Sequence, residues 1–460
     1  MSKNPVEPST SVSEAACTAT IEISDTEQAT ITGYSTNTAK EFVFFILCVV
    51  TLGVLPLMFY WKPNWRVRCT CDRSPLETAQ LVLITGHHGS EIRWIYTITG
   101  AHESSRSSPA ECKGFDMPRA SVSLPTPDGR FCPYPSYRLF TFRKLKYVAP
   151  GNTGHFAVLP ALNNCAVSLD TLHELAKHGG LNFNSVLERA KVYGRNVIDV
   201  RLKPLWVLLF REALSPFYAF QTFSVFVWFM DEYEYYASVI LFLCLGSIAL
   251  NVYLVRKQEI TIRNMVHSTD VVVVTRNHRE QTICSDQLVP GDLLSLAGHG
   301  CIMHCDAVLV SGTCIVNESM LTGESIPITK TPLPHSQSNG QDGYDRKLHS
   351  RHTLYCGTKV LQTRYYEDRP VQAVVIATGF ATTKAQLVRS IMYPKPVDFR
   401  FTKELFRFVL LLACIAAIGM VYSLVIMATL GASWRRLIFR TLDIITIAVP
   451  AALPAVMSIG

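Results

Sequence analysis

The chain has 460 residues, of which 48% are hydrophobic and 17% are charged, with a net charge of +7. This length allows several domains, and so apolar a composition is typical of proteins with membrane-spanning segments. Basic residues gather beside apolar runs rather than along one stripe, which argues against a nucleic-acid-binding protein. The fourteen cysteines are scattered; Cys69 and Cys71 lie close together, but no two pairs occur at zinc-finger spacing, so we expect reduced, structural thiols.

The first 37 residues are rich in Ser, Thr and Glu and contain no apolar core. This composition predicts a disordered cytosolic tail over residues 1–37, neither a signal peptide nor a folded unit. An apolar run over Phe42–Trp61 follows, and it contains Gly53 and Pro56. Because proline removes a helical hydrogen bond, we predict a re-entrant membrane hairpin over residues 38–66, with a simple crossing helix as the alternative.

Residues 67–200 have a mixed composition, with a strand-like apolar run at residues 81–84 and a Ser/Pro-rich loop at residues 103–133. We predict a small N-terminal α+β domain in the cytosol. It contains no catalytic constellation. His87 and His88 have no partners at metal-ligand spacing, so we expect them to have surface or packing roles.

Two apolar segments, Leu205–Met230 and Tyr236–Val255, predict the first and second core membrane spans within residues 201–257. Acidic residues lie between the two segments and basic residues lie outside them: Asp231, Glu232 and Glu234, then Arg201, Lys203, Arg256 and Lys257. Since positive residues mark the cytosolic ends of spans, we predict a luminal or extracellular acidic turn and a cytosolic segment after the second span.

Residues 258–400 change to short β-branched runs separated by glycines and turns, which predicts a β-rich cytosolic domain. Its polar segment at residues 335–350 is typical of a surface insertion between strands. Two further apolar segments, at about residues 404–430 and 437–460, predict a third span and the start of a fourth within residues 401–460. The last one has no basic or aromatic cytosolic anchor, so we expect a truncated product or a fragment.

The strongest local signal is the run CIVNESMLTGESIP at residues 314–327. Two companion motifs precede it, LVPGD at residues 288–292 and CDA at residues 305–307. Together they resemble the actuator-domain signature of P-type ATPases. Thr-Gly-Glu-Ser alone is also an ordinary turn sequence, but its flanks and its place between two pairs of apolar segments favour the actuator interpretation.

The resemblance implies a chemistry for the four residues of this motif. P-type ATPases pass through an aspartyl-phosphate, whose hydrolysis requires a carboxylate that orients and deprotonates an in-line water. Glu324 is that candidate. Gly323 would let the backbone approach the phosphate, and the hydroxyls of Thr322 and Ser325 would brace the turn. The resemblance also implies a distorted jelly roll for the actuator domain.

Residues 377–391 resemble the end of the same domain, although the family has glycine where Ala385 stands. We expect this departure to affect a local turn only.

The last apolar segment contains the run Pro450-Ala451-Ala452-Leu453-Pro454. Its prolines lack N–H groups, so the carbonyls of Thr446 and Pro450 lose their helical partners and could contact a cation in a protein-lined cavity. A mere kink in a packing helix is the alternative. Asp443 could be an acid that holds the cation, or an interfacial aspartate without a role.

Three runs narrow the resemblance to the type V, subgroup B P-type ATPases, the polyamine-transporting group: residues 209–221, residues 388–396, and residues 442–447 with the proline run. The similarity extends from about residue 31 to the end. That subgroup has a second proline where Ala451 stands, so the carbonyl of Ile447 would stay bonded here. The sister subgroup has glutamate where Ala452 stands. An inorganic ion would therefore lack a strong ligand, and a long organic polycation is favoured.

The resemblance implies further partners. Similar proteins bind acidic phospholipids through their N-terminal region. The four basic residues after the hairpin could do so here, or could simply be cytosolic flanks: Lys62, Arg66, Arg68 and Arg73. ATP and Mg²⁺ would serve the full-length family member, bound by domains absent from this chain, which contains no Asp-Lys-Thr-Gly or Gly-Asp-Gly motif. We expect a monomer that binds no nucleic acid.

The sequence therefore predicts a multi-domain α-helical membrane protein that forms the N-terminal part of an ATP-driven translocase. It would move polyamines or another cation from the lumen of late endosomes or lysosomes to the cytosol, and the isolated chain would be inactive. The alternative is a truncated, non-catalytic membrane regulator that binds lipid or partner subunits. A channel has little support, because no ring-forming repeat is present.

Overall fold

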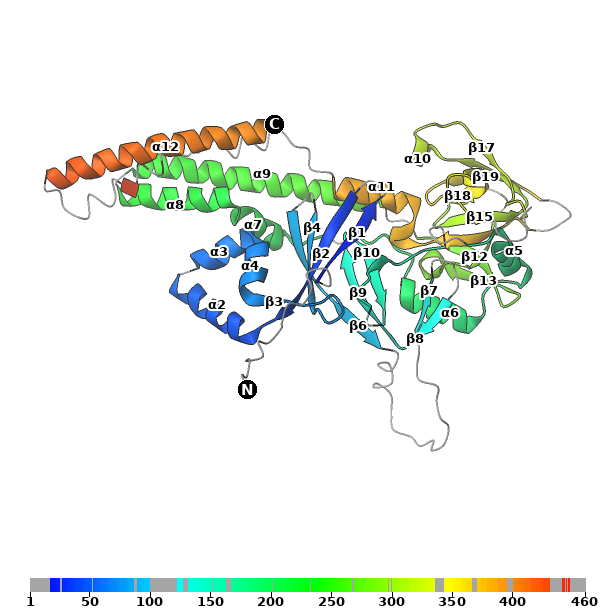
Figure 1. The fold of residues 1–460 in the computed structure, drawn as a ribbon. Coiled ribbons are helices and arrows are strands. Elements are labelled where there is room, and N and C mark those ends of the chain that lie inside the picture. Colours follow the sequence, from blue (N-terminus) through cyan, green and yellow to red (C-terminus); the bar gives the residue numbers. More distant parts are fainter. Residues whose placement is uncertain are drawn as a thin grey trace, which may run out of the picture. The chain divides into compact units, whose positions relative to one another are not determined.

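The computed structural model describes residues 17–24, 27–51, 53–86, 89–99, 122–126, 131–151, 153–162, 167–200, 202–231, 233–266, 269–296, 298, 300–335, 343–365, 370–394, 400–430, 441, 442, 444 and 446. The chain divides into two compact units (Figure 1). The larger comprises Met1–Leu52, Lys62–Asp199 and Val266–Lys395, and the smaller comprises Gly53–Trp61, Val200–Met265 and Pro396–Gly460.

An antiparallel sheet in the order β1-β2-β4-β5, with β3 paired to β2, begins the larger unit. Its strands are β1 (Thr18–Ser24), β2 (Glu27–Thr36), β3 (Cys71–Arg73), β4 (Leu81–Gly86) and β5 (Gly89–Trp94). The predicted disordered tail over residues 1–37 is therefore wrong for residues 18–24 and 27–36. Their apolar residues are few but alternate along β1 and β2, so that Ile21, Ala29 and Ile31 point into a core.

A second sheet, in the order β11-β10-β9-β6, shares that core. Its strands are β6 (Tyr96–Thr99), β9 (Ser136–Phe142), β10 (Leu145–Pro150) and β11 (Ala157–Val158), and a separate ribbon pairs β7 (Val122–Pro125) with β8 (Phe131–Tyr134). Phe140 stacks on Tyr147 with ring centroids 5.1 Å apart. A buried ion pair between Arg143 and Glu27, 3.0 Å apart, links this sheet to β2.

The third sheet has six strands in the order β13-β12-β14-β20-β15-β18. These are β12 (Val271–Arg276), β13 (Arg279–Cys284), β14 (Leu293–Ser295), β15 (Asp306–Ser311), β18 (Thr353–Leu354) and β20 (Gln372–Ala377). Successive residues of β20 enter different cores: Ala373 and Val375 lie in one, and Val374 and Ile376 in the other. The sheet is therefore apolar on both faces.

Helix α5 (Leu169–Lys177) supplies Leu169 and Leu172 to the second of these cores. Asn196, which follows α6 (Phe183–Tyr193), donates from Nδ2 to the carbonyls of Ser285 and His304 and accepts from the amide of Gly379. The segment before the predicted border at residue 200, which we assigned to the N-terminal domain, thus packs on the sheet of the predicted β-rich domain. An apolar sheet face needs a cover, and the segment before that border provides it.

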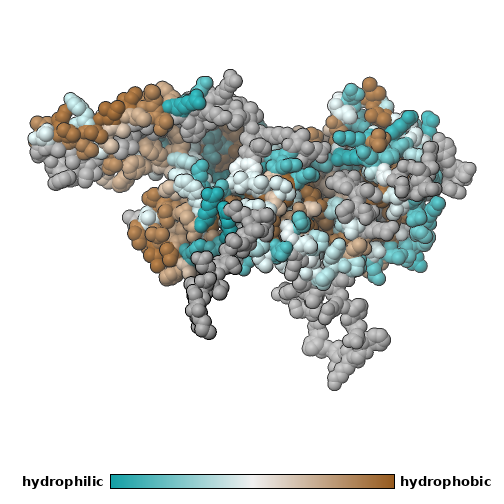
Figure 2. Space-filling view, in the orientation of Figure 1, coloured by the Kyte–Doolittle hydropathy of each residue, from teal (hydrophilic) through white to brown (hydrophobic). Residues whose placement is uncertain are grey.

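Three short helices follow β2 along the chain. They are α2 (Thr38–Val50), capped by the Asn37 side chain, α3 (Val54–Trp61) and α4 (Pro63–Thr70). The interruption after α2 coincides with Gly53 at φ +88°, whereas Pro56 lies in the first turn of α3, where its missing N–H needs no partner. Apolar side chains are exposed along α2 (Figure 2). The hairpin itself remains a prediction.

The smaller unit contains α7 (Leu205–Ala213), α8 (Pro216–Met230), α9 (Glu234–Val266) and α12 (Arg400–Thr429). Among the described residues, two helices are long and apolar enough to cross a membrane, α9 and α12, and α7 with α8 makes a third if the pair is one bent span. The span predicted over Leu205–Met230 is bent in the structure, by 69° where Ser215 caps α8 and Pro216 begins it. Helix α9 also continues past the predicted end at Val255.

Inside this unit, polar side chains join the helices. The Tyr218 hydroxyl lies 2.9 Å from Ser247 Oγ, and Asn251 donates to Glu212 over 3.3 Å. Most of the predicted fourth span lies outside the described residues.

The stability of the larger unit should depend on pH through His173 on α5. Burial, followed by the nearby His335, lowers the pKa of His173 from its ordinary value of 6.5; hydrogen bonds to the backbone of Pro334 and Leu333 and the charge of Asp170 oppose this. The folded state thus binds a proton less readily than the unfolded state. Stability should be lost as the pH falls below about 6.5 towards the lowered pKa.

Differential scanning fluorimetry between about pH 7.5 and about pH 5.5 measures this effect. The apparent melting temperature of the native chain should fall on acidification, and His173→Leu should flatten that dependence. The exposed His155 provides the control, because His155→Leu should keep the native slope. A His173→Leu variant with the native slope would contradict the assignment.

Candidate functional site

The Thr-Gly-Glu-Ser motif lies in the connection between β16 (Thr313–Asn317) and β17 (Ile328–Lys330), which form a three-stranded sheet with β19 (Lys359–Arg364) (Figure 1). The register pairs Val316 with Ile328 and Cys314 with Lys330. Residues 317–327 therefore form a closed loop whose two ends are held by a strand ladder.

A short helix, α10 (Ser319–Thr322), shapes the loop. The carbonyl of Glu318 accepts from the amides of Leu321 and Thr322, at 2.8 and 3.1 Å, and from the Thr322 hydroxyl at 3.2 Å. Gly323 ends the helix in the left-handed conformation, with φ +79°. The chain then turns, and the amide of Glu324 donates to Thr322 Oγ1 over 3.2 Å.

All four motif residues are exposed. Among the described residues, neither the Glu324 carboxylate nor the Ser325 hydroxyl has a hydrogen-bond or ion-pair partner. Both hydroxyls were predicted to stabilise the turn; the Thr322 hydroxyl bonds to it, and the Ser325 hydroxyl does not. A solvated carboxylate on a short, ordered turn can accept a proton from water, or contact a group that another part of the protein presents.

A buried ion pair lies at the base of the loop, and the motif did not predict it. Lys330 Nζ is 2.6 Å from Glu318 Oε1, and the two side chains are 3% and 7% exposed. The contact is electrostatic, since Glu318 Oε1 makes no hydrogen bond of usual angle. The signal in the sequence was a charged residue at each end of the loop, next to apolar strands.

The two companion motifs hold the sheet rather than the loop. Asp292 is fully buried, pairs with Arg276 at 2.6 Å and accepts from the amide of Val289. Asp306 accepts from the amide of Cys356 and from the amide and hydroxyl of Thr383. Burial raises the pKa of Asp306, while these hydrogen bonds oppose the rise. Both acids have structural partners.

Ala385 lies in the first turn of α11 (Thr383–Met392) and is fully buried, below the Thr382 cap. The expectation that it alters a turn is wrong, because the residue is helical. Alanine favours a helix more than glycine does.

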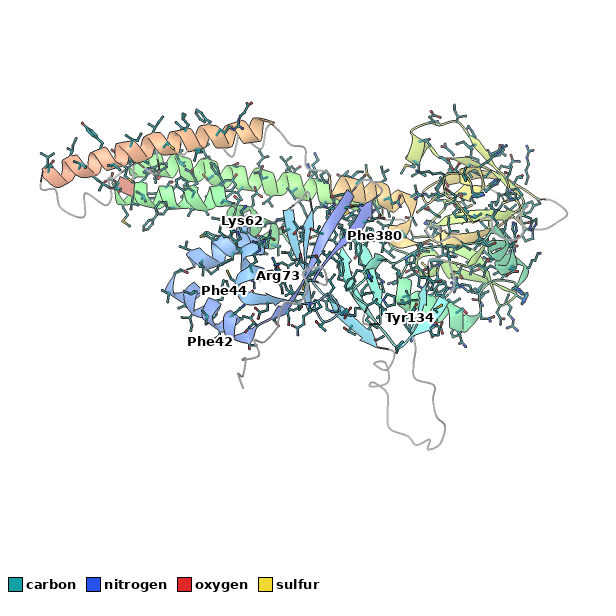
Figure 3. All side chains as sticks on the ribbon, in the orientation of Figure 1. Phe42, Phe44, Lys62, Arg73, Tyr134 and Phe380 are labelled. Carbon is teal, nitrogen blue, oxygen red and sulfur yellow. The ribbon has the colours of Figure 1, made fainter. Side chains whose placement is uncertain are left out.

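The predicted lipid-binding residues are exposed. Arg66 and Arg68 lie on α4 on either side of Val67, which packs into a core with Leu81 and Leu83. Lys62 precedes α4 and Arg73 ends β3; both are labelled in Figure 3. Lipid binding by this set remains a prediction.

Of the predicted cation-binding residues, Thr446 is described, and it is helical and buried. The others lie outside the described residues: Asp443, Pro450, Ala452, Leu453 and Pro454. His87 and His88 also lie outside them.

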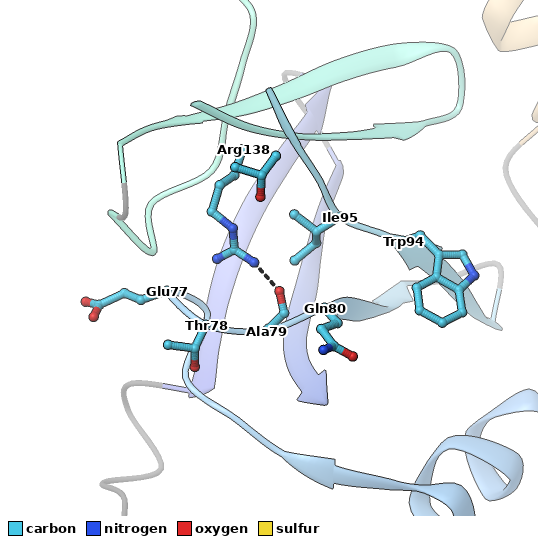
Figure 4. A pocket seen from close by; sticks show the side chains of 8 residues that line it. Glu77, Thr78, Ala79, Gln80, Trp94, Ile95 and Arg138 are labelled. Carbon is cyan, nitrogen blue, oxygen red and sulfur yellow. Dashed lines mark hydrogen bonds between the residues drawn. The ribbon is translucent and has the colours of Figure 1, made fainter. Parts of the chain in front are cut away.

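No group of three or more metal-ligating side chains occurs among the described residues. A cavity of about 410 Å³ opens beside the two N-terminal sheets, and the buried Arg138 lines it (Figure 4). Its guanidinium donates to the carbonyls of Leu76 and Ala79. These bonds give Arg138 a structural role at the turn before β4.

Family models match three parts of the chain. The P-type ATPase actuator domain matches residues 266–392, the P5-type ATPase cation transporter matches residues 25–148, and the cation transporter/ATPase N-terminus matches residues 165–228. The last match starts before α5 and continues into α8.

Curated relatives align along nearly the whole chain. It is 42% identical over 94% of its length to the probable cation-transporting ATPase catp-6 of Caenorhabditis elegans. It is 39% identical over 96% to the polyamine-transporting ATPase 13A3 of Mus musculus, and 38% identical over 95% to the probable cation-transporting ATPase 13A4 of the same species. These alignments cover 33%, 37% and 37% of the relatives, so the chain spans about a third of their length.

Replacing Gly323 should loosen the loop without unfolding the protein. A methyl group at this position meets no atom within 4 Å, but an L-residue in the left-handed conformation costs about 1–2 kcal/mol. Hydrogen exchange followed by mass spectrometry should show faster exchange of residues 319–326 in Gly323→Ala. Gly323→Asn should stay close to native, because asparagine tolerates this conformation.

Gly246→Ala in α9 is the matched control, since its added methyl also meets no atom and its backbone is helical. Native exchange in Gly323→Ala would mean that the loop does not depend on a left-handed residue.

Proposed function

The chain belongs to the P-type ATPases of type V, subgroup B, and from this premise we propose that it carries the dephosphorylation loop of an ATP-driven polyamine or cation transporter. The proposal depends on one observation: the carboxylate of Glu324 is exposed, and the turn that carries it is ordered by a hydrogen bond to Thr322. Such a carboxylate can enter the phosphorylation site of another domain and reach a water there.

In this mechanism Glu324 accepts a proton from the water that attacks the aspartyl-phosphate and holds that water in line. Gly323 has no side chain to obstruct the approach of the loop to the phosphoryl group. Thr322 fixes the backbone of Glu324 through its hydroxyl, and Ser325 stays free to contact the phosphorylated partner. P-type ATPases in general use ATP and Mg²⁺, and we assign their binding to regions outside this chain.

The substrate we propose is a polyamine, moved from the endolysosomal lumen to the cytosol. The name of the 13A3 relatives supports this class, as does Ala452, which offers no charge to an inorganic ion. We assign its contacts to Thr446 and Asp443 and to Pro450, Ala452, Leu453 and Pro454. The apolar helices α9 and α12 support a membrane-spanning protein, and we propose that it is a monomer with the N-terminus and the loop-bearing domain in the cytosol.

In this assignment the β-rich domain, a distorted jelly roll, is the actuator. The exposed basic residues of α4 and β3 would face acidic phospholipids, because α2 next to them presents apolar side chains.

Glu324→Gln tests the proposal in a chimera that joins this chain to the remaining regions of a close relative. Removal of the general base should slow decay of the aspartyl-phosphate about 100-fold or more, while its formation from ATP stays native. The decay of the native chimera should quicken with spermine. Rapid-quench measurement with radioactive ATP follows both steps.

The exposed Glu280 on β13 provides the control, since Glu280→Gln makes the same change in charge outside the loop. Equal decay of Glu324→Gln and native protein would exclude Glu324 as the catalytic carboxylate.

A further inference from the structure

We infer that the buried ion pair of Glu318 and Lys330 is the positioning device for Glu324, fixing the angle at which the loop presents its carboxylate. The inference rests on the proposed function and adds two residues to it. Neither side chain reaches the exposed tip, so both act through the loop backbone.

Lys330 is held in three directions. Its Nζ lies 2.6 Å from Glu318 Oε1, donates to the carbonyl of Ser350 over 2.9 Å and lies 5.1 Å from the centre of the Tyr355 ring. Ser350 begins the 3₁₀ turn η2 (Ser350–His352), which leads directly into β18 of the six-stranded sheet. Through Lys330, the position of the Glu318 side chain is therefore tied to that sheet.

From Glu318, hydrogen bonds continue to the tip. Its carbonyl accepts from the amide and the hydroxyl of Thr322, and that hydroxyl accepts from the amide of Glu324. The Asn317 side chain caps the same turn by accepting from the amide of Ser319 at 2.9 Å. A rotation of Glu318 would thus move the turn that carries Glu324.

The strand ladder alone fixes the loop less well. Strand β17 has three residues, and its ladder with β16 ends at Val316 and Ile328, so that ladder does not reach the turn that carries Glu324. A charged pair fixes the relative orientation of two side chains, whereas an apolar contact allows several orientations. Burying two charges contributes little to net stability, and control of a unique geometry is a better explanation of their presence.

The test separates positioning from stability. In Glu318→Gln or Lys330→Met, one charge is buried without its partner, so the melting temperature should fall. In the double variant Glu318→Met/Lys330→Met no charge is left buried, and the melting temperature should return to within about 2 °C of native. Decay of the aspartyl-phosphate in the chimera should still be about 10- to 100-fold slower, because the carboxylate is misplaced.

Phosphoenzyme formation should stay native in the double variant, and adding Glu324→Gln to it should slow decay no further than Glu324→Gln alone. In the full chain, amides of residues 319–326 should exchange faster. A double variant with native decay, beside a slow Glu324→Gln, would overturn the inference and leave the proposed function intact. Native decay in Glu324→Gln itself would overturn both.

Discussion

The six-stranded sheet is apolar on both faces, and that property determines how the larger unit is built. Along β15, Ala307 and Leu309 enter one core while Val308 enters the other. The first core also contains Cys314 and Val316 of β16, so the stem of the loop is part of it. The second core is closed by α5. Exposure of either face would place a large apolar area in water, so the stem and α5 are required for the same physical reason.

After α5, which covers the second face, the chain reaches Asn196. The side chain and the amide of Asn196 together make hydrogen bonds with four backbone groups between residues 285 and 379. Ser285, Asp286, His304 and Gly379 provide them. A few residues later, at Val200, the chain enters the smaller unit with its apolar helices. A displacement of the body that carries Glu324 would therefore pull on the segment that leads to α7. In the proposed transporter this connection would couple the dephosphorylation loop to the membrane helices.

Much of this arrangement could be read from the sequence, and the failures have specific causes. The β-rich domain after residue 258 and the motif at Glu324 could be predicted because each is encoded by residues that are adjacent in the sequence. Strands β1 and β2 were missed because threonine and serine, abundant there, are typical both of disordered tails and of solvated strand faces. The break before Pro216 was missed because average hydropathy ignores a Ser-Pro cap. The pairing of Glu318 with Lys330 depends on the register of β16 and β17, which apolar periodicity does not fix.

The carboxylate that we propose to be catalytic is exposed, and the loop orders it through contacts at its base. Glu324 must stay accessible, since its proposed partner belongs to another domain, so burial of its own side chain cannot order it. Left on a mobile loop, it would reach the water in the right orientation only part of the time, and fixed orientation is a large share of what a catalytic base contributes. Hydrogen bonds connect Glu324 through Thr322 to the backbone of Glu318, and the side chain of Glu318 pairs with Lys330. Order at the tip is thus obtained by burying charge at the base.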